Sequence, residues 1–150
     1  MYTFLEVKLL HDDATLPTVA HPGEDLAYDL YLPYPTTIGS NETVIAETGI
    51  AARAFENTEA GYKRPLGMII KDRSSLASKG LFTHGGVIDP GYTGEIKVIL
   101  FNSTEHDVTL REGTKIAQMV PVRSYTGDIV EVEGWGDTSR GDKGFGSSGQ

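Results

Sequence analysis

The residues best suited to chemistry lie in one short stretch, 85–95, with the sequence Gly-Gly-Val-Ile-Asp-Pro-Gly-Tyr-Thr-Gly-Glu. Two apolar residues precede the carboxylate of Asp89, a Pro-Gly pair turns the chain, and the ring of Tyr92 follows. Because proline presets φ and glycine accepts a positive φ at no steric cost, this stretch favours a tight hairpin. We therefore expect Asp89 and Tyr92 to lie side by side on a rigid edge. An ordinary hairpin, in which both residues are common, explains the stretch equally well.

A second polar group, Arg73-Ser74-Ser75, follows an apolar strand candidate at 66–71. Serine at a helix start, good helix formers after it and Gly80 at the end predict one short helix of about two turns near 74–80. A guanidinium beside hydroxyls and free amides forms an anion site at such a helix start. A capped surface helix with a solvated arginine is the default alternative for this segment by itself.

Two more polar side chains interrupt apolar strand candidates. Asp29 lies within 27–32, where an aspartate is unfavourable by propensity, so it indicates a buried partner or a role. Gln118 lies within 115–122 and is either a ligand contact or an outward-facing residue.

The composition limits the class of protein. A chain of 150 residues is most simply one domain, and its formal net charge of -8 argues against a general nucleic-acid binder. The absence of cysteine excludes disulfides and thiolate chemistry, and the four histidines are scattered without metal-ligand spacing. We expect no signal peptide and no membrane span, and therefore a cytoplasmic protein without a membrane partner.

Short apolar segments separated by turn residues predict strands, and no helical periodicity extends beyond the one short helix. Besides the central stretch, the strand candidates are 2–10, 27–32, 43–55, 66–71, 106–110, 115–122 and 129–133. We therefore expect an all-β fold, a mainly antiparallel barrel or sandwich of roughly 8 to 11 strands.

The composition changes near the C-terminus, and we expect a domain at 1–134 followed by a flexible tail at 135–150. Residues 144–149 match GxGxxG, but the chain ends where a dinucleotide-binding helix would have to begin. The tail carries Arg140 and Phe145 among glycines and serines, which suits a strap that closes over a phosphate ligand.

Taken in order, these pieces resemble the five motifs of the homotrimeric dUTPase family, from about residue 27 to the end. The motifs are Ala-Tyr-Asp-Leu at 27–30, Arg-Ser-Ser-Leu-Ala at 73–77, Gly-Val-Ile-Asp at 86–89 with Tyr92 and Gly94, Gly-Thr-Lys-Ile-Ala-Gln at 113–118, and Arg140-Gly141 with 144–149. Each motif alone is weak, but their order makes the resemblance specific.

The resemblance implies a jelly-roll subunit in a trimer whose sites are shared between chains. It implies hydrolysis of dUTP to dUMP and pyrophosphate, which limits uracil in DNA and supplies dUMP for thymidylate synthesis. It also implies Mg²⁺ that bridges the phosphates and is bound mainly through phosphates and water, with no dedicated protein ligands.

The resemblance assigns roles to individual residues as well. Asp89 is implied as the general base, Tyr92 as the group that excludes a ribose 2′-hydroxyl, and Asp29 as an organiser of metal waters or of an adjacent arginine. The implied substrate-binding residues are Arg73, Ser74, Ser75, Gly86, Val87, Ile88, Tyr92, Gly94, Lys97, Gln118, Arg140, Phe145, Gly146 and Ser147.

One departure from the family keeps alternatives open. Thr83-His84-Gly85 stands where many dUTPases have an asparagine-containing segment, and it gives some similarity to dCTP deaminases, which share the fold. Those enzymes need a glutamate where this chain has Ile99, so deamination is not expected. The alternatives are a deoxypyrimidine triphosphate pyrophosphatase with relaxed base preference, which also accepts dCTP, and a nucleotide-binding regulator without catalysis.

Overall fold

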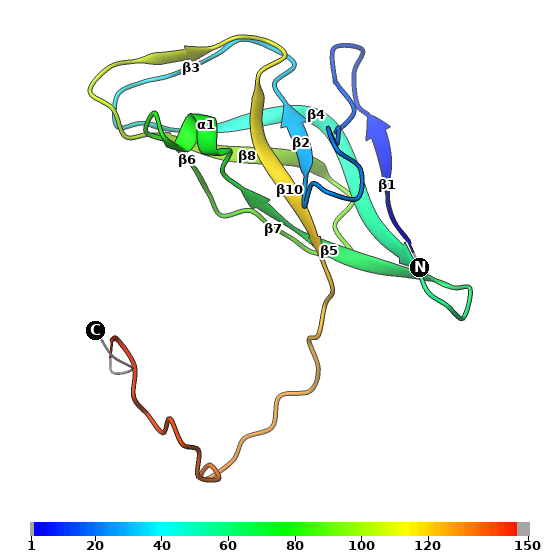
Figure 1. Cartoon of the computed structure of the whole chain (residues 1–150). Coiled ribbons are helices and arrows are strands. Elements are labelled where there is room, and N and C mark those ends of the chain that lie inside the picture. The colour runs from blue at the N-terminus through cyan, green and yellow to red at the C-terminus, as the bar shows by residue number, and fades with distance from the viewer. Residues whose placement is uncertain (1, 147–150) are drawn as a thin grey trace.

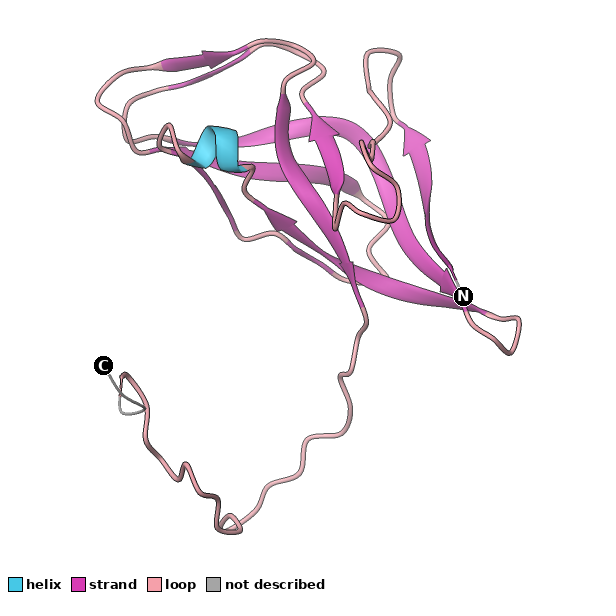
Figure 2. Cartoon of the chain, in the orientation of Figure 1, coloured by secondary structure: helices cyan, strands magenta, loops and turns pink. Residues whose placement is uncertain are grey.

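Antiparallel strands form nearly all of the regular structure in the computed structural model, which describes residues 2–146 (Figures 1 and 2). The strands are β1 (Tyr2–Leu9), β2 (Tyr28–Tyr31), β3 (Thr36–Ile38), β4 (Thr43–Asn57), β5 (Lys63–Lys71), β6 (Leu81–His84), β7 (Val87–Ile88), β8 (Glu95–Asn102), β9 (Val108–Leu110) and β10 (Lys115–Val122), and the helix is α1 (Ser74–Ala77). The all-β prediction is confirmed. Across residues 2–146, no helix is long and apolar enough to span a membrane.

Strand β5 joins the two layers of the fold. Its first part, 63–66, pairs with β4, whereas 67–71 pairs with β10 on its other edge, and Met68 and Ile69 pair with β7. One layer is therefore β2-β10-β5-β7, and the other contains β4, β8 and β6 with β1 alongside β4. This antiparallel, two-layered arrangement is the jelly-roll-like architecture expected from the sequence.

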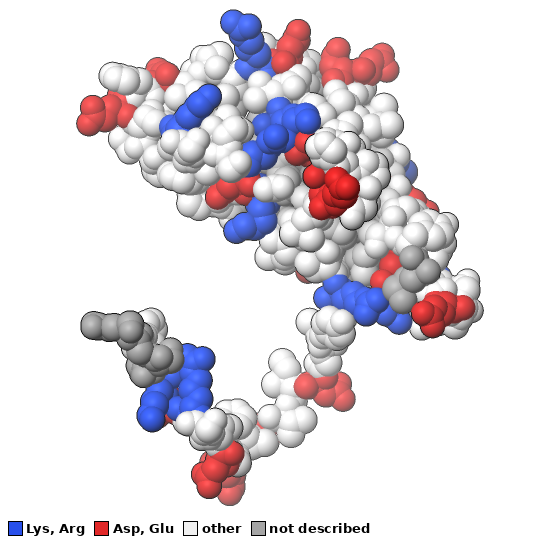
Figure 3. Space-filling model, viewed as in Figure 1, with Lys and Arg blue, Asp and Glu red and all other residues white. Residues whose placement is uncertain are grey.

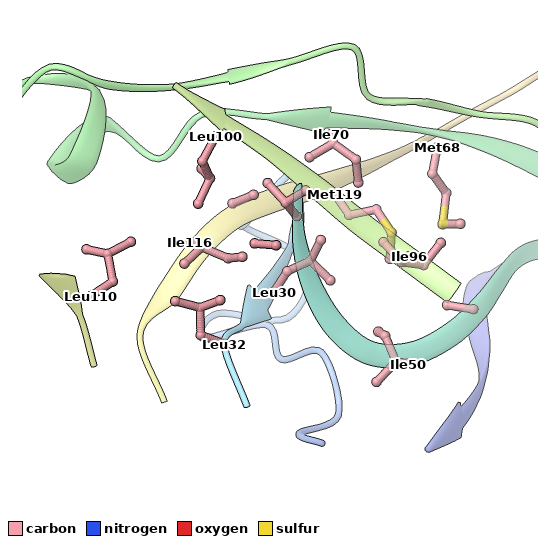
Figure 4. Close-up of a cluster of buried hydrophobic side chains, with 14 of the residues drawn as sticks. Leu30, Leu32, Ile50, Met68, Ile70, Ile96, Leu100, Leu110, Ile116 and Met119 are labelled. Carbon is pink, nitrogen blue, oxygen red and sulfur yellow. The ribbon is translucent and has the colours of Figure 1, made fainter. Parts of the chain in front are cut away.

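The core lies between these layers (Figure 4). Leu30 from β2, Met68 from β5, Met119 from β10 and Ile96 and Leu100 from β8 point into it and are almost completely buried. Strand side chains alternate between the two faces, so the same alternation that buries these residues turns their neighbours toward solvent.

Three features of the sequence prediction are wrong. The stretch 85–95 is not a hairpin, because β7 pairs with β5 while β8 pairs with β4 and β6, so the turn connects the two layers. The helix is a single turn instead of two, because it ends at Ser78, and Gly80 then takes a φ of +85°. Residues 129–133 form no strand, and Ile129 is 99% exposed; β-propensity alone does not order a segment that lacks a partner strand.

Asn102, at the end of β8, joins loops that are distant in sequence. It is completely buried, and its Nδ2 donates hydrogen bonds to the carbonyl oxygens of Ile38, Gly39 and His106 at 2.8–3.1 Å. Its Oδ1 accepts from the backbone N and the hydroxyl of Thr104 at 3.0 and 2.7 Å. A buried amide with all its partners rigidifies such a region, whereas its loss leaves several buried groups unsatisfied.

We expect Asn102→Ala to lower the free energy of unfolding by about 2–4 kcal/mol, because it leaves buried carbonyls without donors. Urea denaturation followed by circular dichroism measures this change. The control is Asn57→Ala, at a half-buried strand end, for which we expect a change below about 1 kcal/mol. Equal effects of the two substitutions would show that Asn102 does not hold these loops together.

Candidate functional site

The register of three neighbouring strands brings the predicted phosphate-binding residues together. Gln118 on β10 lies opposite Asp29 on β2 and, across its other edge, opposite Lys71 on β5. Arg73 follows Lys71 by two residues. Figure 3 shows basic side chains over β2 and β10 on this face, next to a carboxylate. The cleft here, of about 340 Å³, is lined by Ala20, His21, Asp25, Leu26, Ala27, Asp29, Arg73, Ser74, Lys115 and Gln118.

Asp29 lies between two cations. Its Oδ1 pairs with Nη1 of Arg73, and its Oδ2 pairs with Nζ of Lys115 at 2.9 Å. The hydrogen bond to Asp29 and the attraction of its charge raise the pKa of Lys115. An aspartate inside a strand indicated a partner, and Asp29 has two charged ones. The family resemblance implied that Asp29 organises either metal-bound waters or an adjacent arginine, and its contact with Arg73 favours the second role. Arg73, Lys115 and Asp29 together carry a net charge of +1, whereas Asp25, which also lines the cleft, carries a second negative charge.

The sequence analysis did not identify Lys115, although it belongs to the same motif as Gln118. The signal that could have identified it is that Lys115 and Gln118 lie three residues apart on one strand, next to a strand that carries Asp29. Because the pairing of β10 with β2 shifts register between Lys115 and Ala117, simple alternation does not place the lysine on the face of Gln118.

Asp72 is a second residue that the sequence analysis missed, and it holds the backbone in front of Arg73. Gln118 donates from Nε2 to the carbonyl oxygen of Asp72 at 2.7 Å, while the backbone N and the hydroxyl of Thr83 both donate to Asp72 Oδ1. Partial burial acts to raise the pKa of Asp72, but the two hydrogen bonds from Thr83 and the charge of Lys71 outweigh it and lower this pKa. Gln118 is therefore an orienting residue in this structure.

The turn after β7 holds Asp89 and Tyr92 next to each other. The backbone N of Tyr92 donates to the carbonyl oxygen of Asp89 at 3.0 Å, and the phenol donates to the carbonyl oxygen of Glu95 at 2.9 Å. A Cβ on Gly94 would lie 2.5 Å from the phenol oxygen of Tyr92, so the ring would have to shift to admit any other residue. A hollow of about 220 Å³ lined by Val87, Ile88, Asp89, Tyr92, Glu95 and Lys97 opens beside the turn.

Arg53 on β4 supports this turn from behind. Its Nε and Nη2 both donate to the carbonyl oxygen of Pro90, at 3.3 and 3.2 Å, and its guanidinium lies 4.9 Å from the centre of the Phe55 ring. Nothing in the sequence near Asp89 pointed to this contact, because 37 residues separate its two partners.

Two further predicted binding residues are Gly86, whose position admits only glycine, and Lys97, whose side chain is paired with carboxylates. Gly86 has a φ of +91°, and a Cβ on it would lie 2.9 Å from the carbonyl oxygen of Ile70, so only glycine fits. Lys97 lines the hollow of Asp89, but its ammonium pairs with Glu47 at 3.3 Å and Glu95 at 3.8 Å. Its charge is therefore balanced by carboxylates of its own chain.

A single chain does not bring all predicted site residues together. The cleft of Asp29 and the hollow of Asp89 share no lining residue, and exposed Ser75 lines neither of them. Arg140 donates from Nε to the carbonyl oxygen of Lys143 within the tail, and Phe145 and Gly146 are fully exposed to solvent. Figure 1 shows the tail leading away from the end of β10. Ser147 lies outside the described residues.

The carboxylates and histidines do not form a dedicated metal cage. Across residues 2–146, no group of three or more His, Cys, Asp or Glu side chains lies close enough to hold a metal ion. This donor set fits a Mg²⁺ ion that keeps several waters and is held by substrate phosphates.

Comparisons with known proteins identify the family to which the chain is similar. A family model described as dUTPase matches residues 12–149. The chain is 39% identical over 145 residues to the deoxyuridine 5′-triphosphate nucleotidohydrolase of Clostridioides difficile, with 97% of each chain covered. It is 38% identical over 136 residues to that of Vaccinia virus (strain Copenhagen), covering 91% of this chain and 86% of the viral one. The solved dUTPase of Staphylococcus bacteriophage 80alpha with dUPNHPP superimposes with a TM-score of 0.84 at 26% identity, covering 98% and 99% of the two chains.

We expect Thr83→Val to lower the free energy of unfolding by about 1 kcal/mol at pH 7, because it removes one hydrogen bond to ionised Asp72. Since the folded pKa of Asp72 is lowered, this contribution is complete above the unfolded pKa and is lost as the pH falls through the folded value. Urea denaturation from pH 7 down to about pH 2 should therefore show the difference from the wild type shrinking in acid. Thr43→Val, at an exposed strand position, is the control. A difference that is independent of pH would contradict the assigned contact.

Proposed function

Because the chain belongs to the dUTPase family, whose members are hydrolases, we propose that it hydrolyses dUTP to dUMP and pyrophosphate. The observation that carries this proposal is the turn at 89–92, where a carboxylate and an aromatic ring adjoin one hollow. A backbone hydrogen bond from Tyr92 to Asp89 closes the turn, and the phenol is held by the carbonyl oxygen of Glu95. The cleft with Arg73 and Lys115 supports it, because two cations around one carboxylate suit a triphosphate. The reaction limits uracil in DNA and supplies dUMP for thymidylate synthesis.

In the proposed reaction Asp89 is the general base. Its carboxylate accepts a proton from a water molecule, whose oxygen forms a bond to the α-phosphorus. The bond from the α-phosphorus to the oxygen bridging the β-phosphorus breaks, and pyrophosphate leaves with that electron pair. The turn contributes by fixing the backbone from which the carboxylate projects, so that the base starts close to the position from which it acts.

Substrate binding is divided among three groups of residues in this proposal. Tyr92 packs against the deoxyribose, and the backbone at 86–88 and Gly94 pairs with the uracil edge. Phosphate binding falls to Arg73, Ser74, Ser75 and Gln118, with Asp29 orienting Arg73 and with Lys97 next to the base hollow. The tail residues Arg140, Phe145, Gly146 and Ser147 close over the bound nucleotide.

We propose that Mg²⁺ enters with the nucleotide and is held mainly by its phosphates and water. When bound, the ion neutralises phosphate charge and fixes the orientation of the α-phosphate. The chain supplies the surrounding cations and the carboxylate of Asp29, which is already paired with Arg73 and Lys115.

We also propose that the chain works as a homotrimer with shared sites. The separation of the phosphate cleft from the base hollow supports this, because one chain leaves each as an open, partial site. The chain after β10 supports it too, since Ile129, Val130 and Trp135 are at least three-quarters exposed and would gain apolar contacts on a second copy. The division into a domain at 1–134 and a strap at 135–150 belongs to this proposal.

The relaxed base preference receives no support from the contacts of Thr83. Its hydroxyl donates to Asp72 and would have to leave that partner to contact a base. Ile99, which lies opposite His84 in the β6–β8 pair, adds no proton-transferring group.

Pyrophosphate release measured with dUTP, dCTP, dTTP and UTP tests the function directly. We expect Mg²⁺-dependent turnover of dUTP alone and its loss when a chelator is added, because the triphosphate charge is then no longer neutralised. Comparable turnover of dCTP would favour the relaxed pyrophosphatase. Tight binding of dUTP without turnover would favour the regulator.

Asp89→Asn should reduce kcat for dUTP by a factor of at least about 10²–10⁴, because an amide cannot accept the proton of the attacking water. Calorimetric titration with a non-hydrolysable dUTP analogue should give an affinity close to that of the wild type. Asp12→Asn removes an exposed carboxylate away from both hollows and serves as the control. Turnover near the wild-type rate in Asp89→Asn would exclude this residue as the base.

A further inference from the structure

A buried carboxylate with two arginines lies where the chain leaves β10. The tail as the structure has it begins there, at Arg123, and includes the predicted strap at 135–150. Glu56, near the end of β4, is only 4% exposed. Its Oε1 accepts from Nη1 of Arg64 and from Nε of Arg123, both at 2.9 Å, and its Oε2 accepts from Nη2 of Arg123 at 3.0 Å. The hydrogen bond from Arg123 is the main reason that the pKa of Glu56 is lowered. A fork of two parallel bonds from one guanidinium fixes orientation as well as distance.

This cluster joins the tail to the body of the fold. Glu56 and Arg64 face each other in the β4–β5 pair, so both belong to the two-layered domain. Arg123 is the first residue after β10, where sheet pairing has ended. Arg123 also interacts with Tyr125, two residues further along the tail. The arginine therefore connects the start of the tail to the β4–β5 hairpin.

The anchored residues lie next to the turn that carries Asp89. Residues 122–126 line one hollow together with 67–69 and 87–90, which includes both Asp89 and Pro90. From residue 127 to 146 the chain is exposed throughout and forms no strand or helix. Figure 1 shows this part of the chain swinging out from the end of β10. The cluster is thus the last point at which charged side chains fix the tail before Arg140 and Phe145.

We propose that Glu56, acting through Arg64 and Arg123, is a positioning residue that sets the direction in which the tail leaves β10 beside Asp89. The cluster thereby determines how readily Arg140 and Phe145 reach the bound nucleotide, a step that rests on the proposed function. The cluster acts by setting the direction in which the tail leaves β10, and not by shortening the free part of the tail. Release of residues 123–126 would lengthen the free tail only slightly, and the entropy of closing a loop rises slowly with its length.

Trp135 provides a direct probe, because it is the only tryptophan in the chain and lies in the tail, where it is 90% exposed. Arg123→Met removes the anchor from the tail side and leaves the pair of Glu56 with Arg64 in the domain. We expect a lower fluorescence anisotropy of Trp135 in the free protein and a fall in kcat/KM for dUTP of about tenfold, as expected when a tethered group loses effective concentration. The matched control is Lys63→Met, on the β4–β5 hairpin, which breaks the ion pair with Glu6 of β1. Lys63 and Arg123 have the same side-chain exposure of 41%, and the control should change neither quantity.

A double-mutant cycle separates positioning from a general structural effect. In a chain that already carries Arg140→Ala and Phe145→Ala, the tail no longer contributes its contacts, so Arg123→Met should have little further effect on kcat/KM. An unchanged Trp135 anisotropy overturns the proposal, and so does a loss of kcat/KM of the same size in both backgrounds. A lower anisotropy with unaltered kcat/KM also overturns it.

Glu56→Gln gives a second approach from the domain side. We expect a fall in anisotropy in the same direction as in Arg123→Met but smaller, since an amide oxygen still accepts from Arg123 but without the charge attraction. If the wild-type protein does not hydrolyse dUTP, the proposed function fails on that result alone. The anisotropy of the two variants still decides whether the cluster anchors the tail.

Discussion

The register of β2, β10 and β5 is the constraint on which the rest of the site depends. It places Asp29, Gln118 and Lys71 abreast, and the chain after Lys71 then carries Asp72 and Arg73 into the cleft. The core fixes this register, because a slip of one residue would turn Met119 and Ala117 toward solvent and Gln118 into the apolar interior. Burial of apolar side chains on one face therefore determines where the polar groups of the other face lie.

The second property of the site is a pair of cations, Arg73 and Lys115, brought together in a chain whose net charge is negative. With a net charge of -8, the protein as a whole repels a polyanion, and a cleft for phosphate must concentrate its cations. Asp29 makes this arrangement stable, since it pairs with Arg73 and Lys115 and leaves them with excess positive charge. The carboxylate of Asp29 thus orients both cations and leaves this group of three side chains with a net charge of +1.

In a single chain, the cleft of Asp29, the hollow of Asp89 and the tail all remain accessible to solvent. The cleft of Asp29 and the hollow of Asp89 are separate, and the apolar side chains of Ile129 and Trp135 lie in solvent. Polar contacts between residues distant in sequence fix the backbone and side chains around these surfaces. Arg53 holds the carbonyl oxygen of Pro90, Thr83 holds Asp72, and Glu56 holds Arg123.

The sequence by itself determined what depends on neighbours along the chain. Alternation of apolar and polar residues predicted most strands, and the ordered motifs indicated the family. Tertiary structure decided what depends on partners far away. It made 85–95 a connection between layers instead of a hairpin, and it left 129–133 without a partner strand. It also paired Asp72 with Thr83 and Glu56 with Arg123. Hydrogen bonds and ion pairs of this kind form only after the core has fixed strand register, so no local pattern of residues contains them.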